Sequence, residues 1–153
     1  MNPDTHYRSL EKMYLSAPIN AFFKPRIAIS LEYAAIEVTI QTAWYHSAQA
    51  VHGSVYFKML DDAAYFAAHS IESEYFILTA AFTTYLTRPV SEGLMKSIGR
   101  VVHQNKTQIL ADSVVYDGRE REIGRGNGLF VRGKIRLSEV RGYGDGYPTE
   151  FER

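Results

Sequence analysis

Residues 53–71 read GSVYFKMLDDAAYFAAHSI, and their apolar positions recur with the period of a helix. At 100° per residue, one apolar stripe contains Gly53, Phe57, Leu60, Ala64, Ala67 and Ile71. Val55, Met59 and Phe66 make the opposite side apolar as well. A helix that is apolar on nearly all sides is a buried helix, so this segment is predicted to be the central element of the fold.

Short runs rich in β-branched and aromatic residues lie on both sides of this helix. The runs predicted to be strands are residues 26–33 and 36–45 before the helix, and 76–86, 94–104, 107–117 and 121–133 after it. Turn residues separate the later runs, as at Asn105-Lys106 and Asp117-Gly118. The pattern predicts an α+β fold in which the last four strands form an antiparallel meander against the buried helix.

The two ends of the chain differ from this pattern. Residues 1–18 predict an extra N-terminal helix, because apolar residues from Tyr7 to Tyr14 have helical spacing and Pro18 ends it. A chain of 153 residues suits one domain with its own core, so residues 1–137 are predicted to be a single domain. Residues 138–153 are rich in glycine and are predicted to be a peripheral or partly disordered tail.

Composition excludes several classes of protein. The formal net charge is zero, so we expect no nucleic-acid or membrane partner held by bulk electrostatic attraction. The absence of cysteine excludes disulfides, thiolate metal sites and a cysteine nucleophile, and it is compatible with a reducing cytoplasm. The sequence shows neither a secretory signal nor an apolar run of roughly 20 residues that could span a bilayer. These features together predict a cytoplasmic protein. The histidines lack metal-site spacing, so we expect no metal.

The segment His46–Ser54 leads directly into the buried helix and carries the first functional signal. The first turn of a helix has unpaired N–H groups and a partial positive charge, and glycine lets a ligand oxygen approach the backbone closely. His52-Gly53 at this place is typical of an oxyanion site for a carbonyl or thioester oxygen. The alternative interpretation is that these two residues merely begin a helix.

Asp61 is the candidate nucleophile or general base. Asp is unfavourable inside a helix, and a carboxylate in a mostly buried helix needs a partner. Asp62 has one, because Lys58 precedes it by four positions. Asp61 has no such partner in the sequence and lies on the shoulder of the apolar stripe, near Ser54 and Tyr65. We therefore expect Ser54 and Tyr65 to contact the substrate.

Asp61 and Gly53 cannot act on one carbonyl group within a single chain. Eight positions separate them, about 12 Å along a helix axis, whereas both must lie about 3 Å from the reacting carbonyl. Two antiparallel copies of the helix at a two-fold interface place Gly53 of one subunit opposite Asp61 of the other. A catalytic role thus predicts at least a homodimer with two equivalent sites.

These residues resemble the PaaI-like (phenylacetyl-CoA) hotdog thioesterases. The resemblance rests on His52-Gly53, on the carboxylate nine positions after the histidine, and on Arg88-Pro89-Val90 before a later strand, and it extends over about residues 26–132. It implies a hotdog fold, in which a curved antiparallel sheet wraps a long central helix. It also implies a homodimer, or a homotetramer built as a dimer of dimers. The implied activity is hydrolysis of acyl-CoA without a metal and with no cofactor except the coenzyme A of the substrate.

The resemblance implies a role for each matched residue. Asp61 attacks the thioester carbon or activates a water molecule, and the Gly53 N–H binds the carbonyl oxygen. His52 shapes the start of the helix, and Thr79 positions the water. Basic side chains would hold the phosphates of coenzyme A, for which Arg88 and Lys106 are the candidates, with Arg125 and Arg132 as alternatives.

Two residues depart from the family pattern. Ser54 stands where the family has a second glycine, and His46 stands where it often has asparagine. The His46 imidazole can still donate a hydrogen bond to a thioester oxygen, so His46 stays among the catalytic candidates. The same departures keep open a second function, a non-catalytic protein that binds or senses acyl-CoA. A hydroxyacyl-thioester dehydratase would resemble a different histidine-containing loop, which this sequence lacks.

Overall fold

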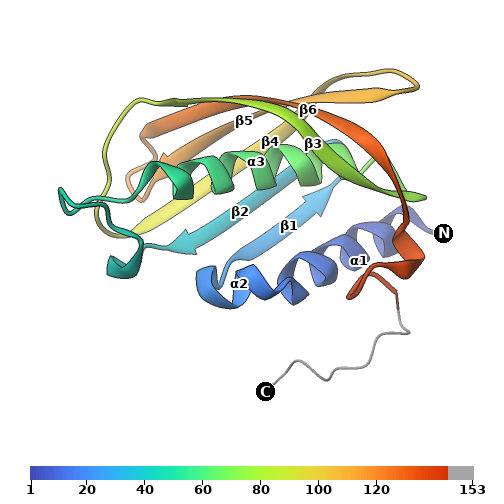
Figure 1. The fold of residues 1–153 in the computed structure, drawn as a ribbon, viewed down its shortest axis with the longest axis horizontal. Helices are drawn as coiled ribbons and strands as arrows, with labels where there is room; N and C mark the ends of the chain where they lie inside the picture. The colour runs from blue at the N-terminus through green and yellow to red at the C-terminus, as the bar shows by residue number, and fades with distance from the viewer. Residues whose placement is uncertain (145–153) are drawn as a thin grey trace.

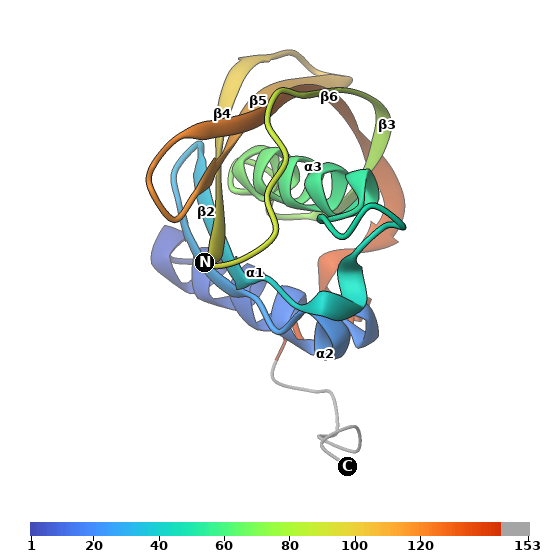
Figure 2. The same cartoon turned by 90° about the vertical axis from the view of Figure 1, so that its left-hand side faces the viewer.

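The apolar segment that begins at Gly53 forms the central helix α3, Gly53–His69. The computed structural model describes residues 1–144, and in it a curved sheet wraps this helix (Figure 1 and Figure 2). The strands are β1 Arg26–Ser30, β2 Tyr33–Thr39, β3 Tyr75–Leu86, β4 Leu94–Gln104, β5 Gln108–Asp117 and β6 Glu122–Arg136. The predicted hotdog fold, a long helix wrapped by an antiparallel sheet, is therefore confirmed.

The order of strands across the sheet is β1-β2-β4-β5-β6-β3, and all neighbours are antiparallel. The predicted meander of the last four strands is wrong in one respect. Only β4, β5 and β6 follow one another, whereas β3 pairs with β6 at the far edge. Residues 87–93 connect the edge strand β3 to the interior strand β4, so that β5 and β6 lie between these two strands in the sheet. In the described residues β3 thus has a strand neighbour on one side only.

Small residues allow α3 to lie very close to the sheet. Ala63, Ala64 and Ala67 are completely buried. A Cβ atom at Gly99 of β4 would lie 2.0 Å from the carbonyl oxygen of Ala63, so only glycine permits this contact. The predicted buried stripe is wrong at Phe57, whose side chain is 42% exposed.

Two helices at the N-terminus lie on the side that the sheet leaves open (Figure 2). Helix α1, Pro3–Ser16, begins as predicted, with the Asn2 side chain accepting a hydrogen bond from the Asp4 N–H. Pro18 ends α1, but it also begins a second short helix, α2, Pro18–Phe23, that the sequence pattern did not predict. The short 3₁₀ helices Thr42–Trp44 and Leu137–Glu139 complete the elements.

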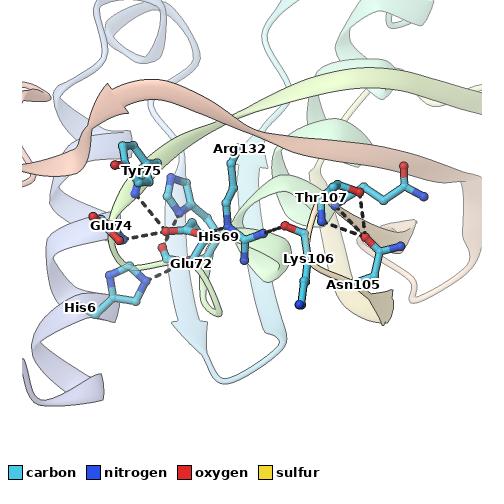
Figure 3. A network of polar contacts seen from close by, with 10 residues as sticks. His6, His69, Glu72, Glu74, Tyr75, Asn105, Lys106, Thr107 and Arg132 are labelled. Atoms are coloured by element: carbon cyan, nitrogen blue, oxygen red, sulfur yellow. Dashed lines mark hydrogen bonds and ion pairs between the residues drawn. The ribbon is translucent and has the colours of Figure 1, made fainter.

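A polar network fastens α1 to the rest of the protein (Figure 3). The His6 Nε2 atom donates to the carbonyl oxygen of His69, 2.9 Å away, and its Nδ1 atom lies 2.6 Å from the Tyr143 hydroxyl. Glu72 accepts from two backbone N–H groups and pairs with Arg132 of β6. Burial lowers the pKa of His6, and it lowers the pKa of His69 to about 4, so both imidazoles are neutral at pH 7.

The predicted tail from residue 138 is described only in its first part. Tyr143 is buried beside α1, and Gly142 lies against Met13 and Ser16. Residues 145–153 of this tail lie outside the described residues. Among the helices of residues 1–144, none combines the length and the hydropathy needed to cross a membrane.

Candidate active site

The first turn of α3 presents one backbone donor. His52 is the N-cap residue, and its Nδ1 atom accepts from the Ser54 N–H at 3.0 Å. The Val55 N–H donates to the His52 carbonyl oxygen, and the Ser54 hydroxyl also lies 2.8 Å from Nδ1. First-turn N–H groups have no acceptor within their own helix. With Ser54 and Val55 occupied by His52, the Gly53 N–H is the first-turn donor best placed to meet a ligand oxygen.

The Asp61 carboxylate is the second part of the candidate site. It accepts a hydrogen bond from the Thr79 hydroxyl at 3.0 Å, which joins α3 to β3. Burial raises the pKa of Asp61 to about 6, the Thr79 hydrogen bond opposes this rise, and the nearby Asp62 carboxylate adds to it. Asp61 is therefore ionised at pH 7 and weakly solvated, as a general base or nucleophile must be.

Asp62 has a structural environment instead. Its Oδ2 atom lies 2.5 Å from the Lys58 Nζ atom, which confirms the predicted pair four positions apart. It also accepts from the Tyr14 hydroxyl of α1 at 2.8 Å. The Lys58 ammonium balances the charge of Asp62, and the Tyr14 hydroxyl joins Asp62 to α1, whereas the hydrogen-bond donor to Asp61 is the neutral Thr79 hydroxyl.

Gly53 and Asp61 lie on the same side of α3, beside β3, but one chain does not bring them together. A Cβ atom at Gly53 would lie 3.1 Å from the Leu86 Cδ1 atom, near the end of β3, and Asp61 bonds to Thr79 farther back along the same strand. The separation along α3 is about 12 Å, as two turns of helix require. Phe57 lies between them on α3 and is exposed.

Comparison with known proteins agrees with this architecture. A family model for the thioesterase superfamily matches residues 48–123, which contain His52, Gly53, Asp61 and Thr79. The chain belongs to the thioesterase superfamily. A search of curated proteins gives no significant match.

Solved structures from the superfamily share the fold of this chain. The E. coli PaaI protein from the phenylacetic acid degradation operon has a TM-score of 0.80 at 17% identity, over 89% of this chain and 99% of that one. A thioesterase family protein from Silicibacter pomeroyi has a TM-score of 0.73 at 24% identity, over 82% and 99%. A Haemophilus influenzae thioesterase has a TM-score of 0.72 at 9% identity, over 81% and 88%.

The other residues predicted for the site are spread over the molecule. His46 is exposed, and its Nδ1 atom accepts from the Ala48 N–H at 3.0 Å within the loop before α3. The Tyr65 ring lines a cavity beside Asp61, but its hydroxyl donates to the Ile77 carbonyl oxygen at 2.8 Å. Ser54 faces His52, as described above.

The two basic candidates lie far apart. The Arg88 side chain is exposed. Arg88 lies near the start of α3, because its carbonyl oxygen accepts from the hydroxyl of Tyr56 in that helix. Lys106 is exposed in the turn between β4 and β5, where its carbonyl oxygen accepts from Arg132. This turn lies near Glu72, which follows the end of α3 (Figure 3). Arg132 is itself paired with Glu72, and Arg125 is paired with Glu122. Arg88 and Arg125 lie at the Gly53 end, since Arg125 of β6 pairs with Tyr85, the neighbour of Leu86.

The structure also reveals residues near Asp61 that the sequence pattern did not single out. A cavity of about 370 Å³ opens beside Asp61 and Thr79, and α1, α2 and residues 140–141 contribute to its wall. Met13 and Tyr14 belong to the run whose helical spacing predicted the N-terminal helix, and both are buried. No local pattern in the sequence indicates that they also face Asp61.

Thr79 provides a test of the Asp61 environment. We expect Thr79→Val to move the acid limb of the kcat/KM profile to higher pH by about one pH unit, because a hydrogen bond to a charged group contributes about 1.5 kcal/mol. A carboxylate that serves as base or nucleophile must be ionised, so activity that depends on Asp61 falls as the pH falls through its pKa, and the Thr79 hydrogen bond lowers that pKa. The measurement is kcat/KM from pH 4.5 to 8. Thr39→Val, at an exposed position of β2, is the matched control and should leave the profile unchanged.

Proposed function

We propose that this protein is an acyl-CoA thioesterase, which converts acyl-S-CoA and water to a carboxylic acid and coenzyme A. The observation that carries the proposal is the Asp61–Thr79 pair, a carboxylate of raised pKa beside a cavity, within the part of the chain that matches the thioesterase superfamily. Neither residue alone distinguishes an enzyme from a binding protein. A weakly solvated carboxylate next to a hydroxyl is the arrangement that water activation requires.

The reaction has two routes that this geometry supports. Asp61 as general base takes a proton from water, and the hydroxide attacks the thioester carbon. Asp61 as nucleophile attacks the carbon directly and forms an anhydride, which water then hydrolyses. In both routes the carbonyl oxygen gains negative charge, which the Gly53 N–H and the positive end of α3 stabilise. The thiolate of coenzyme A leaves and receives a proton.

Gly53 and Asp61 complete one site only across a dimer, and the structure supports one arrangement. The midpoint between these two residues on α3 is Phe57. The midpoint between their neighbours on β3, Leu86 and Thr79, lies near Phe82. The Phe57 and Phe82 rings are in contact, with centroids 5.6 Å apart.

A two-fold axis through this aromatic contact brings Gly53 of the partner subunit beside Asp61. It also pairs the two β3 strands in antiparallel register and extends the sheet. The surface there is unusually apolar for exposed residues: Phe57, Leu78, Tyr85 and Leu86 are 42–62% exposed. A twelve-residue edge strand with such side chains favours pairing with another copy. We therefore propose a homodimer with two equivalent sites, to which a dimer of dimers can add.

A pair of substitutions at Gly53 tests the oxyanion donor. Gly53→Pro removes the N–H but suits the first position of a helix, and His52, at φ −61° and ψ 142°, has a backbone that accepts a following proline. We expect kcat to fall about 10²- to 10³-fold, the loss for one oxyanion donor. Gly53→Ala adds a Cβ atom against the same Leu86 side chain and keeps the N–H, so it should retain most activity.

The measurement is thiol release from short, medium, long and aromatic acyl-CoA substrates. Turnover that the proline variant loses and the alanine variant keeps supports the mechanism. Equal losses in the two variants would contradict a role for the N–H. Absence of turnover on every substrate, with acyl-CoA still raising the melting temperature, would favour the second function, a protein that binds or senses acyl-CoA. The Ser54 and His46 departures leave that outcome open.

A further inference from the structure

The cavity beside Asp61 has an unusual set of walls. One side is formed by α3 and β3, with Asp61, Thr79, Phe66 and Phe76 among the lining residues. The other side is formed by the corner between α1 and α2 and by Val140 and Arg141. The lining residues from this second side are Met13, Tyr14, Ser16, Ala17, Pro18, Val140 and Arg141. All of them lie outside the residues 48–123 that match the superfamily. The reacting carboxylate and the opposite wall therefore come from different parts of the chain.

The lining places two carboxylates and a hydroxyl at one point of a largely apolar cavity. Side chains from α3 and β3 bring the polar groups Asp61, Asp62 and Thr79. Lys58 and Tyr14 already occupy Asp62, so Asp61 is the carboxylate available to a ligand. The remaining lining is hydrocarbon or aromatic, except for Arg141 and for Ser16, whose hydroxyl donates to the Lys12 carbonyl oxygen. A molecule that fits has a reactive polar end near Asp61 and an apolar body, and the acyl part of a thioester has this form.

The second wall is held rigidly in place. Tyr14 is 5% exposed, donates to Asp62, and packs edge-on against Phe66 with centroids 4.9 Å apart. At the other end of α1, His6 bonds to the end of α3 and to Tyr143, as Figure 3 shows for His6 and His69. A wall anchored at both ends of α1 in a close-packed interior limits the size of the group that enters.

We infer that the α1–α2 corner and residues 140–141 form the acyl pocket and determine which acyl groups are accepted. The inference rests on the proposed thioesterase function for its reaction, but it concerns residues that have no part in the chemistry. A volume of about 370 Å³ is at the small end for ligand pockets, so the pocket takes medium-length or compact hydrocarbon acyl groups and excludes long unbranched chains.

Two substitutions change the pocket in opposite directions. Ala17→Phe fills it, at a residue whose extended backbone (φ −64°, ψ 131°) accepts phenylalanine without strain. Val140→Ala enlarges it. Leu15→Phe is the matched control, because Leu15 lies two positions away on α1, is 52% exposed and does not line the cavity. Melting temperatures establish that all three variants fold.

Binding separates this inference from the proposed reaction. In the Asp61→Asn background, the Kd values of coenzyme A, acetyl-CoA, octanoyl-CoA and palmitoyl-CoA are measured by calorimetry. Affinity should rise about fourfold per buried methylene up to octanoyl and then level off. Ala17→Phe should abolish the rise, Val140→Ala should move the levelling-off to longer chains, and Leu15→Phe should change neither.

With Asp61 intact, Ala17→Phe should lower kcat/KM for octanoyl-CoA by about tenfold or more, and Val140→Ala should raise kcat/KM for palmitoyl-CoA. Both variants should leave acetyl-CoA within about threefold, and Leu15→Phe should leave all three substrates unchanged. Turnover with a chain-length preference that Ala17→Phe and Val140→Ala leave unchanged would overturn the pocket while the thioesterase function stands. Length-dependent binding that Ala17→Phe abolishes, in a protein without turnover, would support the pocket and reject the proposed reaction.

Discussion

Asp61→Asn should lower kcat/KM for acyl-CoA hydrolysis at least about a hundredfold, the loss expected for a positioned base, while acyl-CoA binding persists. The substitution keeps the shape of the side chain and its contact with Thr79, and it removes the charge that activates water or attacks the thioester. Single-turnover thiol release at pH 7.5 measures the chemical step. A variant that retains a tenth or more of the activity would exclude Asp61 as nucleophile or base.

The same variant should be at least as stable as the wild type above pH 6. Burial raises the pKa of Asp61 to about 6 in the folded protein, above the ordinary value of 3.8, so the folded state binds the proton more tightly. The stability contributed by the protonated form is present below the ordinary pKa and is lost as the pH rises through 6. Asparagine has no charge to desolvate, so its melting temperature should not fall in this range.

Asp62→Asn supplies the opposite pattern and serves as the comparison. Asp62 pairs with Lys58 and accepts from Tyr14, so its loss should cost about 1–3 kcal/mol of folding free energy. Activity should fall much less than in Asp61→Asn, because Asp62 does not meet the reacting carbon. Adjacent carboxylates in one helix would then separate into one for chemistry and one for structure.

Helical periodicity was sufficient to predict the centre of this fold. The stripe through Leu60, Ala64 and Ala67 is completely buried, as predicted. Phe57 belongs to the same stripe, yet it is exposed, because it lies at the open edge of the sheet beside β3. A periodic pattern records that a position is apolar, and it does not distinguish a core position from an exposed position at the edge of a sheet.

Strand order could not be predicted from the same kind of pattern. Local composition is sufficient to predict each strand segment, whereas the pairing of β3 with β6 joins residues about 50 positions apart. Pro18 ends α1 as predicted, but proline also suits the first turn of a new helix. Helix α2 begins there, and its buried Asn20 side chain donates to the Tyr14 carbonyl oxygen.

The candidate site divides along the same line. The asymmetry between Asp61 and Asp62 could be read from spacing alone, since Lys58 lies one turn before Asp62. The family resemblance, and not the residue pattern, made Thr79 a candidate. In the structure its hydroxyl donates a hydrogen bond to Asp61. The cavity-lining role of α1 and α2 could not be predicted from the sequence. Residues that line a cavity and residues that fill a core have the same helical spacing.

A mixture of Asp61→Asn and Gly53→Pro subunits should recover activity that neither variant has alone. Each homodimer lacks one essential group in both of its sites. In a heterodimer, one site combines the intact Gly53 of one subunit with the intact Asp61 of the other, and the second site lacks both. Random exchange makes half of the dimers mixed, so the mixture should reach about a quarter of wild-type activity.

The measurement uses two affinity tags, one on each variant, with the subunits exchanged by co-expression. Heterodimers purified through both tags should have about half of the wild-type kcat per dimer, because one of two equivalent sites is restored. Tagged homodimers prepared in the same way are the controls. A site built within one chain predicts no recovery at all, since every site would keep one defect. Recovery therefore distinguishes a carboxylate that faces the Gly53 N–H of the partner subunit from one that acts alone, which no single substitution can do.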